Sequence, residues 1–180
     1  MKTNLGYFPL IMIYTLLIGC SQSVKPQKFP PDPRVLKPFS SNVPLQVLVP
    51  KNAEAKYLIE LSGQEQTEFT NLYVDLNDVY KNVKELIEEV LVKQGVPLSS
   101  SSKKYLKFTI NKIWRERWAS GFIFAVFLDF DIETGAGYRK HYRVEDHLSA
   151  TISRDLGGTT KRAVEEIFQD GEIIAYIELQ

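Results

Sequence analysis

The chain has 180 residues with 22 basic and 22 acidic side chains, so its formal net charge is zero. A chain without an excess or a stripe of basic residues lacks the electrostatic footprint of a nucleic-acid-binding protein, which argues against that class of partner. Cys20 is the only cysteine, and this excludes an internal disulfide framework.

Residues 1–19 have the layout of a bacterial signal peptide. Lys2 supplies a short positive region, and residues 5–18 are uncharged and mostly apolar. This run is shorter than the roughly 20 residues of a membrane-spanning helix, but it suits the apolar region of a signal peptide. The run ends in Leu17-Ile18-Gly19-Cys20, which resembles the lipobox of bacterial lipoproteins.

The resemblance to a lipobox implies covalent chemistry at Cys20. The thiol takes a diacylglycerol through a thioether, Gly19 leaves room for the signal peptidase, and the new amine is then acylated too. One acyl chain binds a membrane only marginally, whereas two or more make a stable anchor. The alternative is an ordinary secreted protein whose apolar region ends near a cysteine, but it leaves the lone thiol unexplained.

The residue after Cys20 bears on the destination of the protein. In enteric-type bacteria, an aspartate at this position retains a lipoprotein in the inner membrane, and this chain has Ser21 instead. We therefore expect the protein at the outer membrane, facing the periplasm, with the membrane as one partner through the anchor at Cys20. An envelope protein or a lipid is the expected second partner.

Residues 21–42 predict a linker between the anchor and the body, because they contain five prolines among Lys, Gln and Ser residues. Proline removes backbone donors that helices and strands need, so we expect a semi-extended tether that packs little against the body. Docking of Phe29 and Phe39 on the body is the alternative. The expected organisation is a signal peptide over 1–19, a lipidated cysteine with a Pro-rich tether over 20–42, and a single α+β periplasmic domain over 43–180.

Hydrophobic periodicity predicts the elements of the body. A helix is expected over 75–94, with Asp75 as its N-cap and Gly95 at its end. A second helix should begin at Thr159 or Thr160 and end near residue 169. Strands are expected over 45–49, 57–61, 69–74, 105–118, 122–134 and 138–149, whereas 172–179 fits a helix or a strand. The order predicts an α+β fold: an antiparallel sheet with a three-strand meander in its C-terminal half and two helices packed on one face.

The turn Gly135-Ala136-Gly137 predicts the register of the last hairpin. If it is a three-residue loop with Gly137 in the left-handed region, Phe130 lies opposite Tyr142 and Asp131 lies opposite His141. A loop one residue shorter would set Phe130 against His141 and mix the apolar and charged faces. The three-residue loop is therefore expected.

The acidic positions Asp129, Asp131 and Glu133, with His141 and His147 near them in sequence, are the strongest candidates for a metal site. However, alternate residues along a strand are about 6.6 Å apart, too far for all three acids to bind one ion easily. We expect instead a solvated strand face with charge pairs to Arg139 and Arg143. No metal and no cofactor are predicted.

Catalytic motifs are missing from the sequence. The glycines of 135–137 and Gly157-Gly158 lack the spacing of a phosphate-binding loop and are expected to be turn glycines. No serine lies in the nucleophile elbow of a hydrolase. We therefore predict no catalytic residues and a protein that is not an enzyme.

A possible contact surface is suggested by the aromatic residues near Ala119-Ser120-Gly121. Trp118, Ile123 and Phe127 would form an exposed apolar face, the kind of surface that binds a partner or lipid, if they lie on the side of the sheet away from the helices.

The layout is similar to that of the YajG-type family of small bacterial lipoproteins. The similarity rests on the helix 75–94 ending in Gly95, the strand 106–114, the aromatic-to-acidic strand 122–134, the Tyr-rich return strand, and the C-terminal segment after Asp170. Members of that family are mainly lipoproteins of unknown role, so the similarity implies a lipoprotein and little about mechanism. Our leading expectation is a non-enzymatic binding or accessory role in envelope biogenesis or transport. The layout also resembles the lipopolysaccharide-assembly lipoproteins that plug an outer-membrane barrel, and a periplasmic hydrolase is the remaining alternative.

Overall fold

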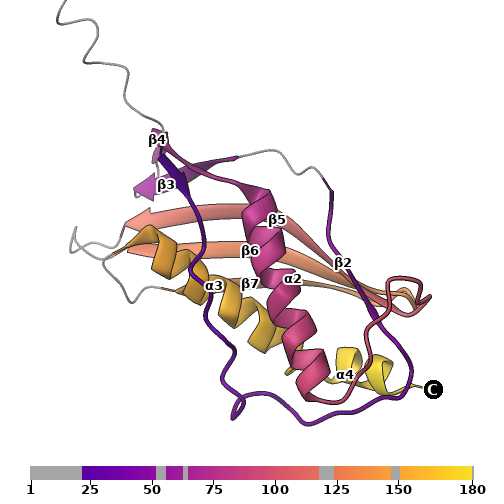
Figure 1. Ribbon diagram of the computed structural model, residues 1–180. Coiled ribbons are helices and arrows are strands. Elements are labelled where there is room, and N and C mark those ends of the chain that lie inside the picture. Colours follow the sequence, from indigo (N-terminus) through magenta and orange to yellow (C-terminus); the bar gives the residue numbers. More distant parts are fainter. Residues whose placement is uncertain (1–21, 52–55, 63–64, 118–123, 147–150, 180) are drawn as a thin grey trace, which may run out of the picture.

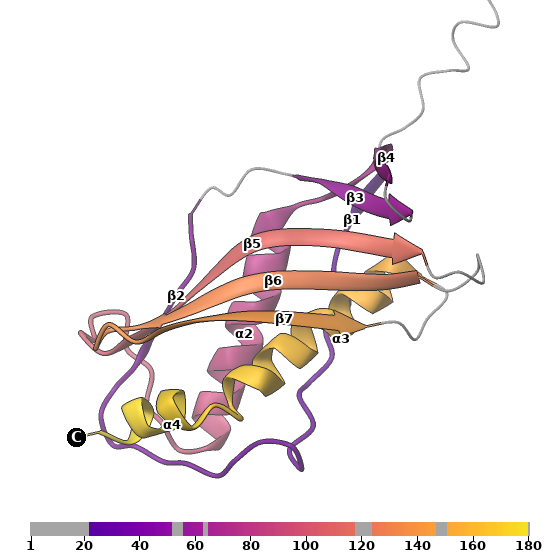
Figure 2. The same ribbon diagram turned by 180° about the vertical axis from the view of Figure 1, so that it is seen from behind.

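The computed structural model describes residues 22–51, 56–62, 65–117, 124–146 and 151–179. In chain order the elements are β1 (Gln22–Val24), β2 (Gln46–Leu48), β3 (Lys56–Ser62), β4 (Glu65–Val74), α2 (Leu76–Lys93), β5 (Tyr105–Arg117), β6 (Phe124–Thr134), β7 (Arg139–Asp146), α3 (Ile152–Ile167) and α4 (Gly171–Glu178). Figure 1 shows α2 and α3 side by side on one face of the sheet, and Figure 2 shows its other face. The predicted α+β class, with two helices on one face, is confirmed.

The strands form one sheet with the order β1-β4-β3-β5-β6-β7, and β2 also pairs with β5. β5, β6 and β7 make the predicted antiparallel meander. The expectation of an antiparallel sheet throughout is wrong, because β1 pairs with β4, β2 with β5 and β3 with β5 in parallel. Parallel partners cannot be joined by a tight turn, so each of these pairs brings together segments separated by a long connection.

The register of the β6–β7 hairpin is the predicted one. Phe130 pairs with Tyr142 and Asp131 pairs with His141. Gly137 has a φ of +88°, and its backbone N–H donates to the carbonyl of Thr134 at 2.9 Å. The side chain of Phe130 is buried and stacks on Tyr142 with a centroid distance of 5.1 Å, so the apolar face of the hairpin lies against the helices.

Helix α2 begins and ends where its capping residues predict. The Asp75 carboxylate accepts from the backbone N–H of Asn77, and Gly95 takes a φ of +82° after the last turn. The buried stripe of α2 packs on the sheet, where Tyr80 makes an edge contact with Phe108 at a centroid distance of 6.2 Å.

Helix α3 begins earlier than predicted, at Ile152, and the N-cap is Thr151 instead of Thr159 or Thr160. Gly157 and Gly158 therefore lie inside the helix, and the expectation that they are turn glycines is wrong. A Cβ at Gly157 would overlap the backbone oxygen of Gln27, and one at Gly158 would overlap the Asp146 carboxylate. The two glycines cost helix propensity but allow α3 to approach both segments closely.

The segment left open at the C-terminus is helix α4. Its N-cap is Asp170, whose carboxylate accepts from the backbone N–H groups of Glu172 and Ile173. Because Ile173 and Ile177 share the buried side, the short helix closes the end of the core.

The segment 25–39, which we call the strap, packs against α2 and α3, and the expectation of a tether with little packing is wrong. The backbone N–H of Gln27 donates to the carbonyl of Ser153 at 2.9 Å, and the Asp32 N–H donates to Glu165 at 2.8 Å. The buried ring of Phe39 stacks on Phe168 at 5.2 Å, so the docking alternative holds for this residue. Prolines remove donors only at their own positions, and other residues of the strap, such as Gln27 and Asp32, still bond to α3.

We predict that Gly157→Ala destabilises the domain although alanine favours a helix by about 1 kcal/mol over glycine. The new methyl group must displace the backbone of Gln27, and such overpacking costs about 1–3 kcal/mol. Urea unfolding measures the change, with Gly171→Ala as the control because nothing lies within 4 Å of a Cβ there. A Gly157→Ala variant at least as stable as the parent would contradict the close approach.

Candidate functional site

The sheet face turned away from the helices carries the acidic residues singled out in the sequence. Asp129, Asp131 and Glu133 of β6 pair across the hairpin with Arg143, His141 and Arg139 of β7. On the other side of β6, Lys107 pairs with Glu133 and Thr109 with Asp131. The cross-strand neighbours of these acids are therefore mostly cations.

Each aspartate on this face is held in an ion pair. Arg143 donates to both oxygens of Asp129, at 2.9 and 3.3 Å. Arg139 donates to Asp131 at 2.6 Å, and His141 Nδ1 lies 3.0 Å from the other oxygen of Asp131. The hydrogen bond from Arg139 is the main reason that the pKa of Asp131 is lowered. The predicted charge pairs to Arg139 and Arg143 are confirmed, although the Arg139 pair is diagonal.

This arrangement engages the acids with protein cations. Within the described residues, no group of three or more His, Cys, Asp or Glu side chains has the geometry to hold a metal ion. The His141 ring hydrogen-bonds to Asp131 and Asn111, and neither is a nucleophile. His147, the other histidine considered, lies outside the described residues.

The structure differs from the prediction of an exposed apolar contact face at Phe127. Phe127 does lie on the side of the sheet away from the main core, but it is only 8% exposed because Trp114 stacks on it at 4.9 Å. The expectation of an exposed ring is therefore wrong for Phe127. Trp118 and Ile123 lie outside the described residues.

A bulge in β5 puts Trp114 on this face. The register of β5 against β6 shifts between Ile110 and Lys112, so Ile113 joins the main core and Trp114 turns to the opposite face. The Tyr80 hydroxyl accepts the backbone N–H of Ile110 at 2.9 Å, which gives this donor next to the bulge a partner. Strict alternation along the strand would put the side chains of Trp114 and Phe108 on the same face of the sheet. The bulge puts them on opposite faces.

Trp114 is enclosed by charged groups. The Lys112 ammonium lies 5.1 Å from the centroid of the Trp114 ring, and the Arg143 guanidinium lies 5.0 Å from it. The indole N–H donates to Glu116 at 2.7 Å. These contacts leave the indole 4% exposed, so the ring belongs to a small buried cluster with Phe127 and Ala125.

A second polar cluster lies on the helix side, around Asp170. Its carboxylate accepts from Tyr142 and Lys140, each at 2.6 Å, and from Tyr138 at 3.3 Å. Burial raises the pKa of Asp170, but the hydrogen bonds from Lys140, Tyr142 and the start of α4 outweigh it and hold the pKa at about 2. The pKa of Tyr142 is raised mainly by burial and, to a smaller extent, by the hydrogen bond to Asp170. The cluster connects β7 to the start of α4. Two signals in the sequence point to it: Tyr142 is one of the alternating apolar, core-facing positions of β7, and Asp170 directly precedes Gly171.

A surface pocket of about 340 Å³ lies between the edge strand β7 and α3. It is lined mainly by charged side chains: Arg143, Glu145, Lys161, Arg162, Glu165 and Glu166. Two further pockets of about 180 and 150 Å³ lie beside α2. Small-molecule sites are typically about 300–1,000 Å³ and mostly apolar, so none of the three has the character of such a site.

A solved structure with a similar fold is described as protein XCC0632 from Xanthomonas campestris, of the DUF330 family. The TM-score is 0.55 and the identity is 11%, with 86% of this chain and 95% of that chain covered. No family model matches this chain, and no curated protein matches it. At this identity the likeness shows a shared fold alone, and the resemblance to the YajG-type family stays a prediction.

We predict that Asp170→Asn removes about 2 kcal/mol of stability at neutral pH. The Asp170 side chain is 4% exposed, and its folded pKa of about 2 lies below the ordinary value of 3.8. A lowered pKa stabilises the fold above the unfolded value, and this contribution is lost as the pH falls towards 2. Urea unfolding of both proteins between pH 7 and pH 2 should therefore show a difference that closes below about pH 4.

Asp32→Asn is the matched control for this prediction. The hydrogen bond from Arg34 is the main reason that the pKa of Asp32 also falls to about 2, but Arg34 is 86% exposed, so this pair should contribute little stability. An Asp170→Asn variant with unchanged stability at pH 7, or a difference that persists undiminished at pH 2, would contradict the role of the carboxylate.

Proposed function

We propose that the chain is a lipoprotein anchored through Cys20 to the outer membrane and facing the periplasm. Its role there is non-enzymatic, as a binding or accessory domain in envelope biogenesis or transport. The observation that carries this proposal is Leu17-Ile18-Gly19-Cys20 at the end of a charge-free apolar run. The structural comparison contributes the fold, shared with a bacterial DUF330 protein, and no function.

Covalent lipid is the mode of attachment that the sequence supports. In the part of the chain that the structure describes, no helix is both long and apolar enough to cross a bilayer. Cys20 is the single thiol of the chain, and thioether formation accounts for its place directly after Gly19.

A binding role fits the described surface better than a hydrolase. A hydrolase would need a nucleophile beside a base, and His141 is bonded to Asp131 and Asn111. The large hydrophobic side chains that are exposed among the described residues are Val35, Val92, Leu98 and Leu179. Val92 is in the last turn of α2 and Leu179 caps α4, at the end of the molecule away from β1 in Figure 1. These side chains offer contact area to an envelope partner.

The variant Cys20→Ser tests the anchor. Serine cannot form the thioether, so the precursor should stay uncut at the lipoprotein site and take up no labelled palmitate in cells. Mass spectrometry of the N-terminal peptide and membrane fractionation measure both effects, with Ser21→Ala as a control that should be acylated normally. Normal processing of Cys20→Ser together with retention at the membrane through its N-terminus would refute the proposal.

The variant Ser21→Asp tests the destination. In an enteric host, aspartate after the acylated cysteine should move the protein from the outer-membrane to the inner-membrane fraction without changing acylation. Density-gradient separation of the two membranes measures the shift. A parent protein found in the inner membrane would refute the proposed localisation and leave the anchor itself intact.

A further inference from the structure

The first strand of the described chain, β1, is an edge strand of the sheet. β1 starts at Gln22 and pairs in parallel with β4, with Gln22 opposite Leu72 and Val24 opposite Val74. Ser21 is the only residue between Gln22 and Cys20. Two Cα–Cα steps span at most about 7 Å, so chain length limits the Cα of Cys20 to about that distance from the Cα of Gln22.

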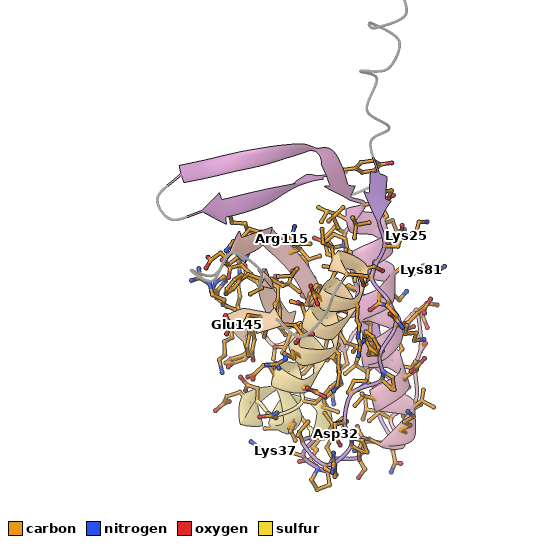
Figure 3. All side chains as sticks on the ribbon, turned by 90° about the vertical axis from the view of Figure 1, so that its left-hand side faces the viewer. Lys25, Asp32, Lys37, Lys81, Arg115 and Glu145 are labelled. Atoms are coloured by element: carbon orange, nitrogen blue, oxygen red, sulfur yellow. The ribbon has the colours of Figure 1, made fainter. Side chains whose placement is uncertain are left out.

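β1 lies at one end of the molecule. Figures 1 and 3 show it beside the β3–β4 hairpin and the start of α2, whereas α4 lies at the opposite end. In Figure 3, Lys25 and Lys81 lie towards the β1 end, and Asp32 and Lys37 lie at the far end. An anchor at Cys20 is thus close to one end of the fold only.

The strap fixes this geometry because it is bonded along the whole length of α3. Gln27 bonds to Ser153 near the start of the helix, and the Lys37 N–H donates to the carbonyl of Phe168 just past its end. Fifteen residues of helix rise about 22 Å. Lys28 adds ion pairs to Glu85 and Glu89 of α2, at 3.2 and 2.5 Å. The strap therefore leads from β1 over the helices to the opposite end of the fold.

We propose that the anchor holds the domain directly against the lipid headgroups, with β1 and the β3–β4 hairpin at the membrane and α4 facing away from it. This inference rests on the proposed acylation of Cys20 and adds an orientation and a lipid-facing end to it. The partner is the headgroup layer of the leaflet that holds the acyl chains. The far end, with the ends of α2 and α4, is then the part presented to the periplasm.

The test compares two dye positions on the acylated full-length protein in vesicles of phosphatidylethanolamine and phosphatidylglycerol that carry a headgroup-attached quencher. Lys81→Cys and Lys37→Cys each introduce the only free thiol, because Cys20 is blocked by lipid. Lys37 is nearer to Cys20 in sequence, whereas Lys81 lies nearer to β1 in Figure 3. We expect the dye at residue 81 to be quenched several-fold more strongly than the dye at residue 37.

A Gly-Ser insertion of about ten residues between Ser21 and Gln22 is the control, because it adds a flexible reach of about 17 Å. It should abolish most of the difference between the two dyes without changing acylation. If the two dyes are quenched equally without the insertion, or the dye at residue 37 more strongly, the proposed orientation is overturned. The proposed function still stands in that case, provided that Cys20 is acylated. A Cys20 that mass spectrometry finds unacylated overturns the proposed function and this inference together.

Discussion

Gly157 and Gly158 lie side by side in α3, at the level where the strap and β7 approach the helix from two sides. A side chain on Gly157 would overlap the backbone of Gln27, and one on Gly158 would overlap Asp146. Helix propensity disfavours both glycines, so their place in the middle of α3 reflects packing. The path of the strap along α3 depends on the close approach at Gly157.

The bulge in β5 has a comparable effect on the sheet. Before the bulge, Phe108 and Ile110 face the helices, and after it Ile113 does so while Trp114 turns away. Tyr80 reaches from α2 to the backbone next to the bulge, so the helix that covers the main core also stabilises the change of face. The second face thereby gains a small aromatic cluster at one end of its row of ion pairs.

The acids of the two polar clusters are engaged by neighbouring side chains. Asp129 and Asp131 are held by arginines, and Asp170 is held by Lys140 and Tyr142, so these acids stabilise the fold. If Cys20 is acylated as proposed, a strap bonded to the helices gives the attached domain a defined orientation.

The sequence by itself determined the α+β class, the span of α2, and the last hairpin with its register, and it carries the resemblance to a lipobox. These features depend on local signals: the caps Asp75 and Gly95, the alternation along β6, and the left-handed residue Gly137. Only the tertiary structure decided the parallel pairings of β1, β2 and β3, the start of α3, the face of Trp114 and the course of the strap. Each of these depends on contacts between segments far apart in the chain. From neighbouring residues alone, Gly157 and Gly158 predict a turn and the prolines of the strap predict a free linker. Both predictions fail because residues distant in sequence pack against α3 at these places.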